Sequence, residues 1–400
     1  MVKSTKIKHK VAVIWGKWGP YHHERFRVLS EKYGVLNCVG IALAGKSINY
    51  QWKSVENTNN DSTFITLYPG KNQETLSPLR IAIDFYKIIR KERIEVVFLP
   101  SYWPGRSIAL LIVAKLMGLK CIMMNESHAG TEKAKGIRKV IKKNIIKLFD
   151  AGLVGGTVQI EYFKSLGMSQ DRLFKGYDVV NNNYYEERKI YSEENADKIR
   201  YKLGLPKKYV LNIGRMVPKK NLDVLIKAYA QLQNDISDSE ESISLVLIGN
   251  GEEESKLKMV AKSLGLFVED LIPETTPNNP KTVYFGGFRD IDDNSLIFSL
   301  STVFVLPSLW EEWGLVVNEA MSCSVPVIVS ETAGCSKDLV IPSLNGFIFD
   351  PKNSCQLSNL IVTIARNPTL QKMMGMESNK HIKDWSCELF ATNAIKAIKV

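Results

Sequence analysis

Short apolar runs alternate along the chain with longer segments in which apolar residues recur every three or four positions. The short runs have the length and composition of buried strands, and the longer segments have the period of helices that bury one face. In the first half the expected strands are 11–15, 36–43, 63–67, 96–100, 121–125 and 152–154, and the expected helices are 78–93, 107–117, 133–149 and 159–166. Strands that alternate with helices form a parallel sheet with helices on both faces.

The second half of the chain repeats this alternation. Its expected strands are 209–213, 245–248, 283–285, 303–306, 325–329 and 347–349, and its expected helices include 198–203, 222–232 and 387–399. Between the halves the chain is polar and rich in turn-forming residues, as linkers between domains are. We therefore predict two α/β domains, 1–185 and 198–380, joined by a linker at 186–197. Four hundred residues, 45% of them hydrophobic, suffice for two buried sheets.

The segment 302–350 contains the densest cluster of candidate functional residues. An apolar strand runs into a turn that contains Gly314, and a helix begins near Leu315. The N-terminus of a helix presents unpaired N–H groups and a partial positive charge, so this turn is a ready site for a phosphate. Glu311 lies in the turn, and Glu319 lies about one helical turn inside the helix.

Two carboxylates beside an anion site need an explanation, because each would repel a phosphate placed directly against it. Eight residues of helix rise about 12 Å, a length comparable with a nucleotide sugar that carries hydroxyls at both ends and phosphate in the middle. Carboxylates are good acceptors for such hydroxyls. The plainer alternative is that Glu311 and Glu312 form a solvated loop pair and that Glu319 is a surface residue of the helix.

A second candidate anion site follows the expected strand 209–213. Gly214 ends this strand, and the cations Arg215 and Lys220 precede the next helix. Backbone N–H groups, the helix dipole and side-chain charge all favour an anion in such a place. Glycines follow the next two strands in the same manner, at Gly249 and Gly287.

The first strand also runs into a glycine-containing loop, 16–19, which precedes a helix near Tyr21 or His22. The spacing is not G-x-G-x-x-G and no acidic residue ends the second strand, so we do not expect bound NAD. Polar groups also follow the strand 121–125, where His128 is a candidate. A lone histidine is more often structural than functional.

The central segment reads Pro-Ser-Leu-Trp-Glu-Glu-Trp-Gly-Leu-Val-Val-Asn-Glu-Ala-Met from Pro307 to Met321, and Pro-Val-Ile follows it. This order resembles the signature of the retaining glycosyltransferases of family 4, the group 1 glycosyltransferases. The resemblance implies the α/β GT-B architecture, in which two Rossmann-like doubly wound domains face each other across a cleft. It also implies that 381–400 is a helix that crosses back to the first domain. The resemblance is specific over the second domain and covers only the layout of the first.

The resemblance implies roles for residues on the donor side. Glu311 would contact hydroxyls of the transferred sugar, and Glu319 would contact the ribose of the nucleotide. Arg215 and Lys220 would hold the donor diphosphate, and Lys219 would be a solvated neighbour. The implied donor-binding residues are Gly214, Arg215, Lys220, Gly249, Gly287, Glu311, Gly314, Leu315 and Glu319.

The resemblance assigns the first domain to the acceptor. His128 would lie close to the transferred sugar. The implied acceptor-side residues are Gly16, Trp18, Gly19, Tyr21 and His22, and the candidate catalytic residues are Glu311, His128, Arg215 and Lys220. Relatives often carry a glycine and a glutamate where this chain has Cys335 and Asp338, which leaves the role of that loop open.

No cofactor and no metal are expected, since the donor itself is a nucleotide sugar. Asp290, Asp292 and Asp293 superficially resemble a D-x-D metal motif, but acids in this place suit the N-terminus of a helix before Leu296. The six cysteines show no C-x-x-C spacing, so we expect reduced thiols rather than disulfides or structural zinc.

The net charge of +11 is uneven along the chain. Residues 1–190 carry 31 Lys and Arg against 16 Asp and Glu, whereas residues 191–400 carry 22 against 26. Seven of these basic residues lie in Lys133–Lys147, where cations and apolar residues occupy different faces of the expected helix. One interpretation is contact with an anionic membrane surface. The other, which we favour for the apolar face, is packing on the sheet with solvated charges. No aromatic residues are interleaved with these charges, so nucleic acid is not an expected partner.

The sequence thus predicts a metal-independent enzyme that moves a sugar from a nucleotide-sugar donor, with retention, to a saccharide or lipid-linked saccharide in polysaccharide or glycoconjugate synthesis. No signal peptide or membrane span is indicated, so the expected location is cytoplasmic, with peripheral association at the inner membrane face as an option. An epimerase or an inverting transferase on the same fold is an alternative, with Glu126 as the candidate base. A catalytically silent protein that binds membranes through its basic half is another.

Overall fold

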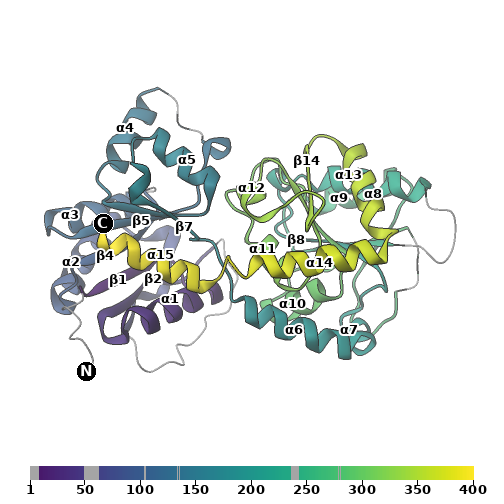
Figure 1. Ribbon diagram of the computed structural model, residues 1–400, viewed down its shortest axis with the longest axis horizontal. Coiled ribbons are helices and arrows are strands. Elements are labelled where there is room, and N and C mark those ends of the chain that lie inside the picture. Colours follow the sequence, from purple (N-terminus) through teal and green to yellow (C-terminus); the bar gives the residue numbers. More distant parts are fainter. Residues whose placement is uncertain are drawn as a thin grey trace. The chain divides into compact units, whose positions relative to one another are not determined.

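The computed structural model describes residues 9–48, 63–102, 105–132, 134, 136–235, 243–277, 279 and 281–400. The chain divides into two compact units (Figure 1). Unit 1 consists of Met1–Asn181 together with Ser386–Val400, and unit 2 consists of Asn182–Trp385.

Unit 1 is built on a seven-stranded sheet in the order β3-β2-β1-β4-β5-β6-β7, with every neighbouring pair parallel. Its strands are β1 (Val11–Trp15), β2 (Cys38–Lys46), β3 (Thr63–Asn72), β4 (Val96–Pro100), β5 (Lys120–Asn125), β6 (Ala151–Val154) and β7 (Leu173–Lys175). The strand order reverses between β1 and β4, and open parallel sheets bind ligands beyond the carboxyl ends of their strands near such a point.

Two helices pack against each other in unit 1 although they come from opposite ends of the chain. They are α1 (Pro20–Tyr33) and α15 (Cys387–Lys399), and α15 also contacts β5, β6 and β7. The other helices are α2 (Pro78–Glu92), α3 (Gly105–Leu116), α4 (Ile137–Ile146) and α5 (Thr157–Ser165).

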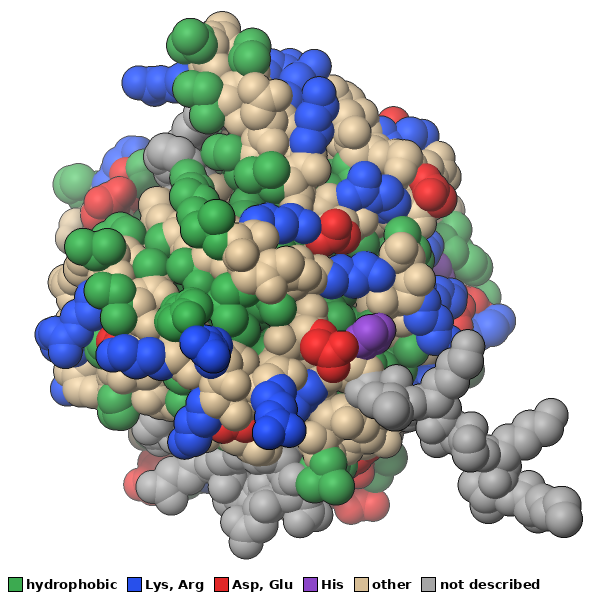
Figure 2. Space-filling view, turned by 90° about the vertical axis from the view of Figure 1, so that its left-hand side faces the viewer, with side chains coloured by type: hydrophobic (Ala, Val, Ile, Leu, Met, Phe, Trp, Pro, Cys, Tyr) green, Lys and Arg blue, Asp and Glu red, His purple; other side chains and the backbone are tan. Residues whose placement is uncertain are grey.

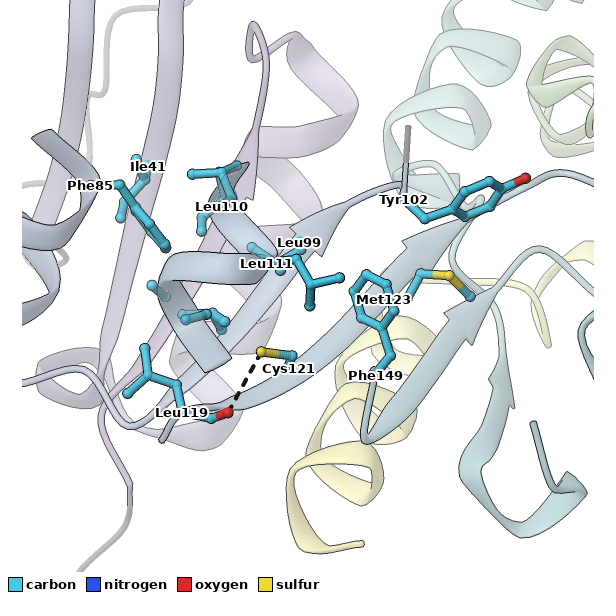
Figure 3. Close-up of a cluster of buried hydrophobic side chains, with 14 of the residues drawn as sticks. Ile41, Phe85, Leu99, Tyr102, Leu110, Leu111, Leu119, Cys121, Met123 and Phe149 are labelled. Carbon is cyan, nitrogen blue, oxygen red and sulfur yellow. Dashed lines mark hydrogen bonds between the residues drawn. The ribbon is translucent and has the colours of Figure 1, made fainter. Parts of the chain in front are cut away.

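A buried apolar cluster joins α2 and α3 to the strands (Figure 3). Phe85 of α2 and Leu111 of α3 lie in this cluster with Ile41, Met123 and Phe149, each at most 1% exposed. Burial of a large apolar side chain stabilises a fold by roughly 1.5–3 kcal/mol. Because the apolar positions of strands and helices meet here, the periodicity of the sequence is sufficient to predict this core.

Unit 2 repeats the architecture with the order β10-β11-β9-β8-β12-β13-β14, again with parallel pairs. Its strands are β8 (Tyr209–Ile213), β9 (Ser244–Ile248), β10 (Phe267–Asp270), β11 (Thr282–Phe285), β12 (Val303–Leu306), β13 (Val327–Ser330) and β14 (Gly346–Phe349). Its helices are α6 (Asn182–Glu194), α7 (Ala196–Leu203), α8 (Leu222–Asp235), α9 (Glu254–Ser263), α10 (Ile291–Ser299), α11 (Leu315–Ser322), α12 (Ser336–Leu339), α13 (Ser354–Ala365) and α14 (Pro368–Ile382).

The segment 186–197, expected as a linker, is helical and groups with unit 2 as the body of α6 and the start of α7. Within this segment Ser192 is buried, and Arg188 pairs with Asp292 of α10 at 2.8 Å. The short edge strands β7 and β10 have no counterpart in the predicted strands, because these two strands bury too few apolar residues to show a pattern.

The expectation that the apolar face of the basic helix packs on the sheet is wrong for most of α4. Ile137, Val140 and Ile141 are 76%, 55% and 52% exposed, and Ile146 is buried. Only the C-terminal end of α4 reaches the core, so the rest of its apolar residues face solvent. Lys133 and Lys135 lie outside the described residues. Within the described ranges, no helix combines the length and apolarity that crossing a bilayer requires.

Candidate functional site

Three glycines line one edge of the unit 2 sheet. Gly214, Gly249 and Gly287 follow β8, β9 and β11, which are neighbours in the sheet. The Gly214 N–H donates to Ile248 O at 2.9 Å, and the Gly249 N–H donates to Gly287 O at 2.7 Å. The three strand ends are therefore hydrogen-bonded side by side at the carboxyl edge, where ligands bind in open α/β sheets.

Gly249 is required by the backbone at this edge. Its φ is +126°, which side-chain-bearing residues rarely adopt, and a Cβ there would collide with the carbonyl oxygen of Gly214. The side chain of Lys220 lies on the other side of Gly214, with its Nζ 3.8 Å from the position of a Cβ. The glycines thus leave bare backbone next to a cation.

The carboxylate of Glu311 is held by two lysines. Its Oε2 accepts hydrogen bonds from Lys220 Nζ and, at 3.2 Å, from Ser308 Oγ, and its Oε1 lies 3.5 Å from Lys219 Nζ. Lys219 also pairs with Glu312 at 2.8 Å. Glu311 is 8% exposed, so the interpretation of Glu311 and Glu312 as a solvated loop pair is wrong for Glu311. Lys219, expected to be solvated, is part of this cluster.

Burial alone would raise the pKa of Glu311, but the charges of Lys220 and Lys219 outweigh burial and lower the pKa below its usual value. Burial would lower the pKa of Lys219, and the carboxylates of Glu311 and Glu312 raise it instead. Both shifts favour the charged forms, an ionised Glu311 and a protonated Lys219. The cluster is a compact array of opposite charges at the strand ends.

Two loops hold the cluster in position. Asn221, in a left-handed conformation with φ of 56°, donates through Nδ2 to Pro307 O at 3.0 Å and to Pro351 O at 2.7 Å. The Leu309 N–H donates to Lys219 O at 2.9 Å. These bonds fasten the lysine loop after β8 to the glutamate loop after β12.

The loop that contains Gly334 and Cys335 braces the glutamate loop from the other side. The Gly334 N–H donates to Glu311 O at 3.0 Å, and the Cys335 N–H donates to Trp313 O at 3.2 Å. Trp313 is 1% exposed and donates through Nε1 to Asn318 Oδ1 at 2.9 Å. The cysteine in place of the relatives' glycine therefore leaves this loop in contact with the glutamate loop.

Helix α11 begins at Leu315 as predicted, with Gly314 as its N-cap at a φ of +103°. Glycine has no side chain with which to cap the helix, and the N-cap residue makes no side-chain hydrogen bond there. Glu319, in the second turn, is 3% exposed and is therefore no surface residue. Arg215 is exposed directly after β8, and within the described part of the chain its guanidinium makes no ion pair.

The structure places the candidate residues of unit 1 in two settings. His128 is 4% exposed and caps a turn, with its Nδ1 accepting from the Gly130 N–H at 3.1 Å. Trp18 is a core residue rather than an available acceptor contact, since it is 4% exposed and its indole N–H donates to Ile41 O at 3.0 Å. A tryptophan side chain can pack in a core or contact a sugar, and the sequence alone did not distinguish the two.

The loop after β1 is organised by its own residues. The Gly19 N–H donates to His22 Nδ1 at 2.9 Å, and burial, with the charge of Arg25 added, lowers the pKa of His22 well below its usual value. A Cβ at Gly16 would collide with the side chain of Gln73. Tyr21 is half-buried at the start of α1.

Unit 1 also contains a buried charged pair. Arg25 of α1 is 2% exposed and Asp178 is 4% exposed, with 3.9 Å between Arg25 Nη2 and Asp178 Oδ1. Arg25 also donates through Nε to Val179 O at 2.9 Å and lies over the ring of Tyr177 at 5.2 Å. Burial raises the pKa of Asp178 to about 6, although Arg25 and Glu126 oppose that shift.

The acidic residues at 290–293 lie at the N-terminus of helix α10 and stabilise it. Asp290 is its N-cap and accepts from the Asp293 N–H at 3.3 Å, which confirms the predicted helix N-terminal cluster. Asp292 accepts from Tyr184 OH at 2.6 Å as well as pairing with Arg188. No group of three or more metal-ligating side chains occurs among the residues that the structure describes.

Known glycosyltransferases are similar to this chain in sequence. Residues 195–381, all within unit 2, match the family model of the glycosyl transferases group 1. An uncharacterized glycosyltransferase of Haemophilus influenzae is 29% identical over 187 residues, which are 46% of this chain and 47% of that protein. An Escherichia coli UDP-Gal:alpha-D-GlcNAc-diphosphoundecaprenol alpha-1,3-galactosyltransferase is 26% identical over 328 residues, covering 79% of this chain and 78% of that protein.

Solved structures resemble the chain over nearly its whole length. Anabaena HepE in complex with UDP and glucose matches with a TM-score of 0.71 at 15% identity, covering 98% of this chain and 100% of that one. The apo lipopolysaccharide outer core galactosyltransferase WaaB matches with a TM-score of 0.67 at 15% identity, covering 97% and 99%. The predicted fold class is confirmed, since the chain has the α/β GT-B fold with two parallel seven-stranded sheets.

The raised pKa of Asp178 predicts a pH dependence of stability. A carboxyl whose pKa is raised on folding stabilises the folded state at pH values below its unfolded pKa, and that contribution is lost as the pH rises through the folded pKa. From well below pH 3.8 to well above pH 6 the loss amounts to about 3 kcal/mol, at 1.36 kcal/mol per pKa unit. The Asp178→Asn variant should lack this component when unfolding free energies are measured by denaturant titration across that range.

The exposed Asp171 provides the matched control in the same unit. Asp171→Asn should follow the pH profile of the wild type. A profile for Asp178→Asn that is parallel to the wild type would show that Asp178 is ionised in the folded protein at the low end of the range.

Proposed function

We propose that this chain is a retaining, metal-independent glycosyltransferase that moves a sugar from a nucleotide-sugar donor to a saccharide or lipid-linked saccharide. The observation that carries the proposal is the ion-paired cluster of Glu311, Lys219 and Lys220 beside the glycine-lined edge of the unit 2 sheet. Bare backbone, cations and a held carboxylate are the groups that a diphosphate and a sugar require.

In this proposal the donor diphosphate exchanges partners with Glu311. A diphosphate that lies along Gly214, Gly249 and Gly287 takes up the charge of Lys220, which pairs with Glu311 in the free protein. The carboxylate is then released to accept hydrogen bonds from hydroxyls of the transferred sugar, while Lys219 keeps it ionised. Arg215, exposed at the end of β8, closes on the diphosphate from the outside.

The reaction develops negative charge on the departing diphosphate and positive character on the sugar carbon. Lys220, Arg215 and the N-terminus of α11 at Gly314 and Leu315 would stabilise that negative charge more strongly in the transition state than in the ground state. Removing one such group typically costs about 2.7–4 kcal/mol of transition-state stabilisation. In the same proposal Glu319 binds the ribose, and His128 lies near the transferred sugar.

Unit 1 would bind the acceptor. The Escherichia coli relative acts, by its name, on a diphosphoundecaprenol-linked sugar, and unit 1 of this chain carries most of the basic charge. A lipid-linked acceptor at an anionic membrane surface fits both facts, and the exposed isoleucines of α4 give that surface an apolar contact.

Nucleotide binding is the first property to test. UDP, GDP and ADP are added to the purified protein and thermal unfolding is followed. A nucleoside diphosphate at 100 times its dissociation constant should add about 2.7 kcal/mol to the free energy of unfolding, and one of the three should be preferred. Arg215→Ala should lose most of this stabilisation, because the mutation removes a positive charge that pairs with the diphosphate.

Lys207→Ala is the matched control. Lys207 is also exposed and lies at the opposite, amino end of the same strand β8. It should keep the full shift. An equal loss in both variants would mean that the nucleotide binds through the overall positive charge and not at Arg215. The absence of stabilisation by all three nucleotides would contradict the donor site.

Retention and metal independence are tested together with the nucleotide sugar whose nucleotide binds. The anomeric configuration of the first product formed is read by proton NMR and should equal that of the donor. The rate should be unchanged by a chelator, because Lys220 and Arg215 supply the positive charge that a metal would supply. An inverted product, or a rate abolished by the chelator and restored by Mg²⁺, would contradict this part of the proposal.

A further inference from the structure

Unit 1 contains a pocket. It has a volume of about 800 Å³ and opens beyond the carboxyl ends of β4 and β5, beside α4 and α5. Its walls are mainly apolar and include the rings of Tyr102 and Tyr162 and the side chains of Ile141 and Ile145. Pockets that bind small molecules typically measure about 300–1,000 Å³ and are lined largely by such residues. Tyr102 lies at the edge of the core drawn in Figure 3.

Three polar groups of this pocket, from Glu132, Lys142 and Tyr162, are paired with one another. Lys142 Nζ lies 2.8 Å from Glu132 Oε2 and 2.7 Å from Tyr162 OH, and the lysine and the glutamate are 14% and 13% exposed. The ammonium also lies 5.0 Å from the ring centre of Tyr102 and 5.3 Å from that of Tyr162. Glu132 and Lys142 neutralise each other, so the charge that the pocket offers to a ligand comes from Arg138, which also lines it.

The rim continues onto the exposed face of α4. Ile137 and Val140 are exposed there next to the cations Arg138 and Lys139, and α4 contains four basic residues and no acidic one. Figure 2 shows hydrophobic and basic side chains together at the top of this side of the molecule, where α4 lies in Figure 1. The pocket therefore combines an apolar interior with a cationic, partly apolar entrance.

We propose that this pocket binds the hydrocarbon chain of a phosphorylated single-chain lipid, with Arg138 holding the phosphate. The proposal rests on the function proposed above, in which the acceptor is lipid-linked, and it adds a site for the lipid part of that acceptor. An apolar wall stabilises a chain roughly in proportion to the area it removes from water, and a guanidinium pairs with phosphate in a bidentate manner.

Charge and polarity favour this occupant over others. A nucleotide or a free saccharide would leave the apolar walls without apolar partners. Its polar groups would lie against Ile141 and Ile145, which cannot form hydrogen bonds with them. A second copy of the chain would bring a like-charged helix against α4. An amphiphile with an anionic head would place its apolar chain in the interior and its negative charge at the cationic rim.

Binding is tested by calorimetry with the full chain and no nucleotide present, at probe concentrations below micelle formation. The probes are farnesyl phosphate, dodecyl phosphate and inorganic phosphate. One or both lipid phosphates should bind with a stoichiometry of one, whereas inorganic phosphate should not. Tighter binding of farnesyl phosphate would assign the site to branched isoprenoid chains, and tighter binding of dodecyl phosphate would assign it to straight acyl-type chains.

Two matched pairs of variants locate the site. Ile141→Glu places a carboxylate in the pocket wall, while Ile137→Glu makes the same change on the same helix at a residue that does not line the pocket. Arg138→Ala and Lys139→Ala form a second pair, since only Arg138 lines it. All four positions are exposed, so folding should be preserved, and thermal unfolding checks it. Ile141→Glu and Arg138→Ala should each weaken binding about tenfold or more, and their controls less than threefold.

Equal weakening in both members of a pair would mean that the lipid adsorbs on the surface of α4, and the pocket proposal would be overturned. Failure of both lipid phosphates to bind would overturn it as well. Because no nucleotide is present, these outcomes are independent of the donor site. A protein that binds farnesyl phosphate but no nucleotide would retain this inference and lose the proposed function.

Discussion

The arrangement of unit 2 depends on the burial of one negative charge between two positive ones. A lone carboxylate at 8% exposure would be costly to ionise, and Glu311 is ionised because Lys220 and Lys219 lie against its two oxygens. This pairing ties the loop after β8 to the loop after β12, which are the two strands at which the sheet order reverses. The contacts of Asn221 and Gly334 with the glutamate loop keep that geometry when solvent surrounds the site.

Such a cluster can serve as a site because its charges can be exchanged. In the proposed function a diphosphate competes with Glu311 for Lys220, and the displaced carboxylate would then be available to sugar hydroxyls. Without a ligand, the ion pairs leave no charge of Glu311 uncompensated. The two units divide the chemistry accordingly, with the balanced charge cluster in unit 2 and the basic surface and apolar pocket in unit 1.

The sequence predicted what depends on local pattern. The central strands, the start of α11 at Leu315 and the glycines after β8, β9 and β11 follow from apolar periods and turn residues. Properties that depend on long-range contacts were missed. Lys219 looked like a solvated neighbour because its partners Glu311 and Glu312 lie about ninety positions away. Trp18 proved to be core, the linker proved to be helical, and the apolar face of α4 proved to be exposed, since periodicity shows that a face is apolar but not what covers it.

The most direct test of the account is the turnover of Glu311→Gln with the nucleotide sugar that binds. Glutamine keeps the shape and loses the charge, so sugar hydroxyls lose their anionic acceptor while Lys220 stays free for the diphosphate. The account predicts a fall in kcat on the order of 100-fold, as for loss of a group that acts mainly in the transition state, with nucleotide affinity equal to or higher than that of the wild type. Wild-type kcat in a folded Glu311→Gln protein would contradict the role of this carboxylate in transfer.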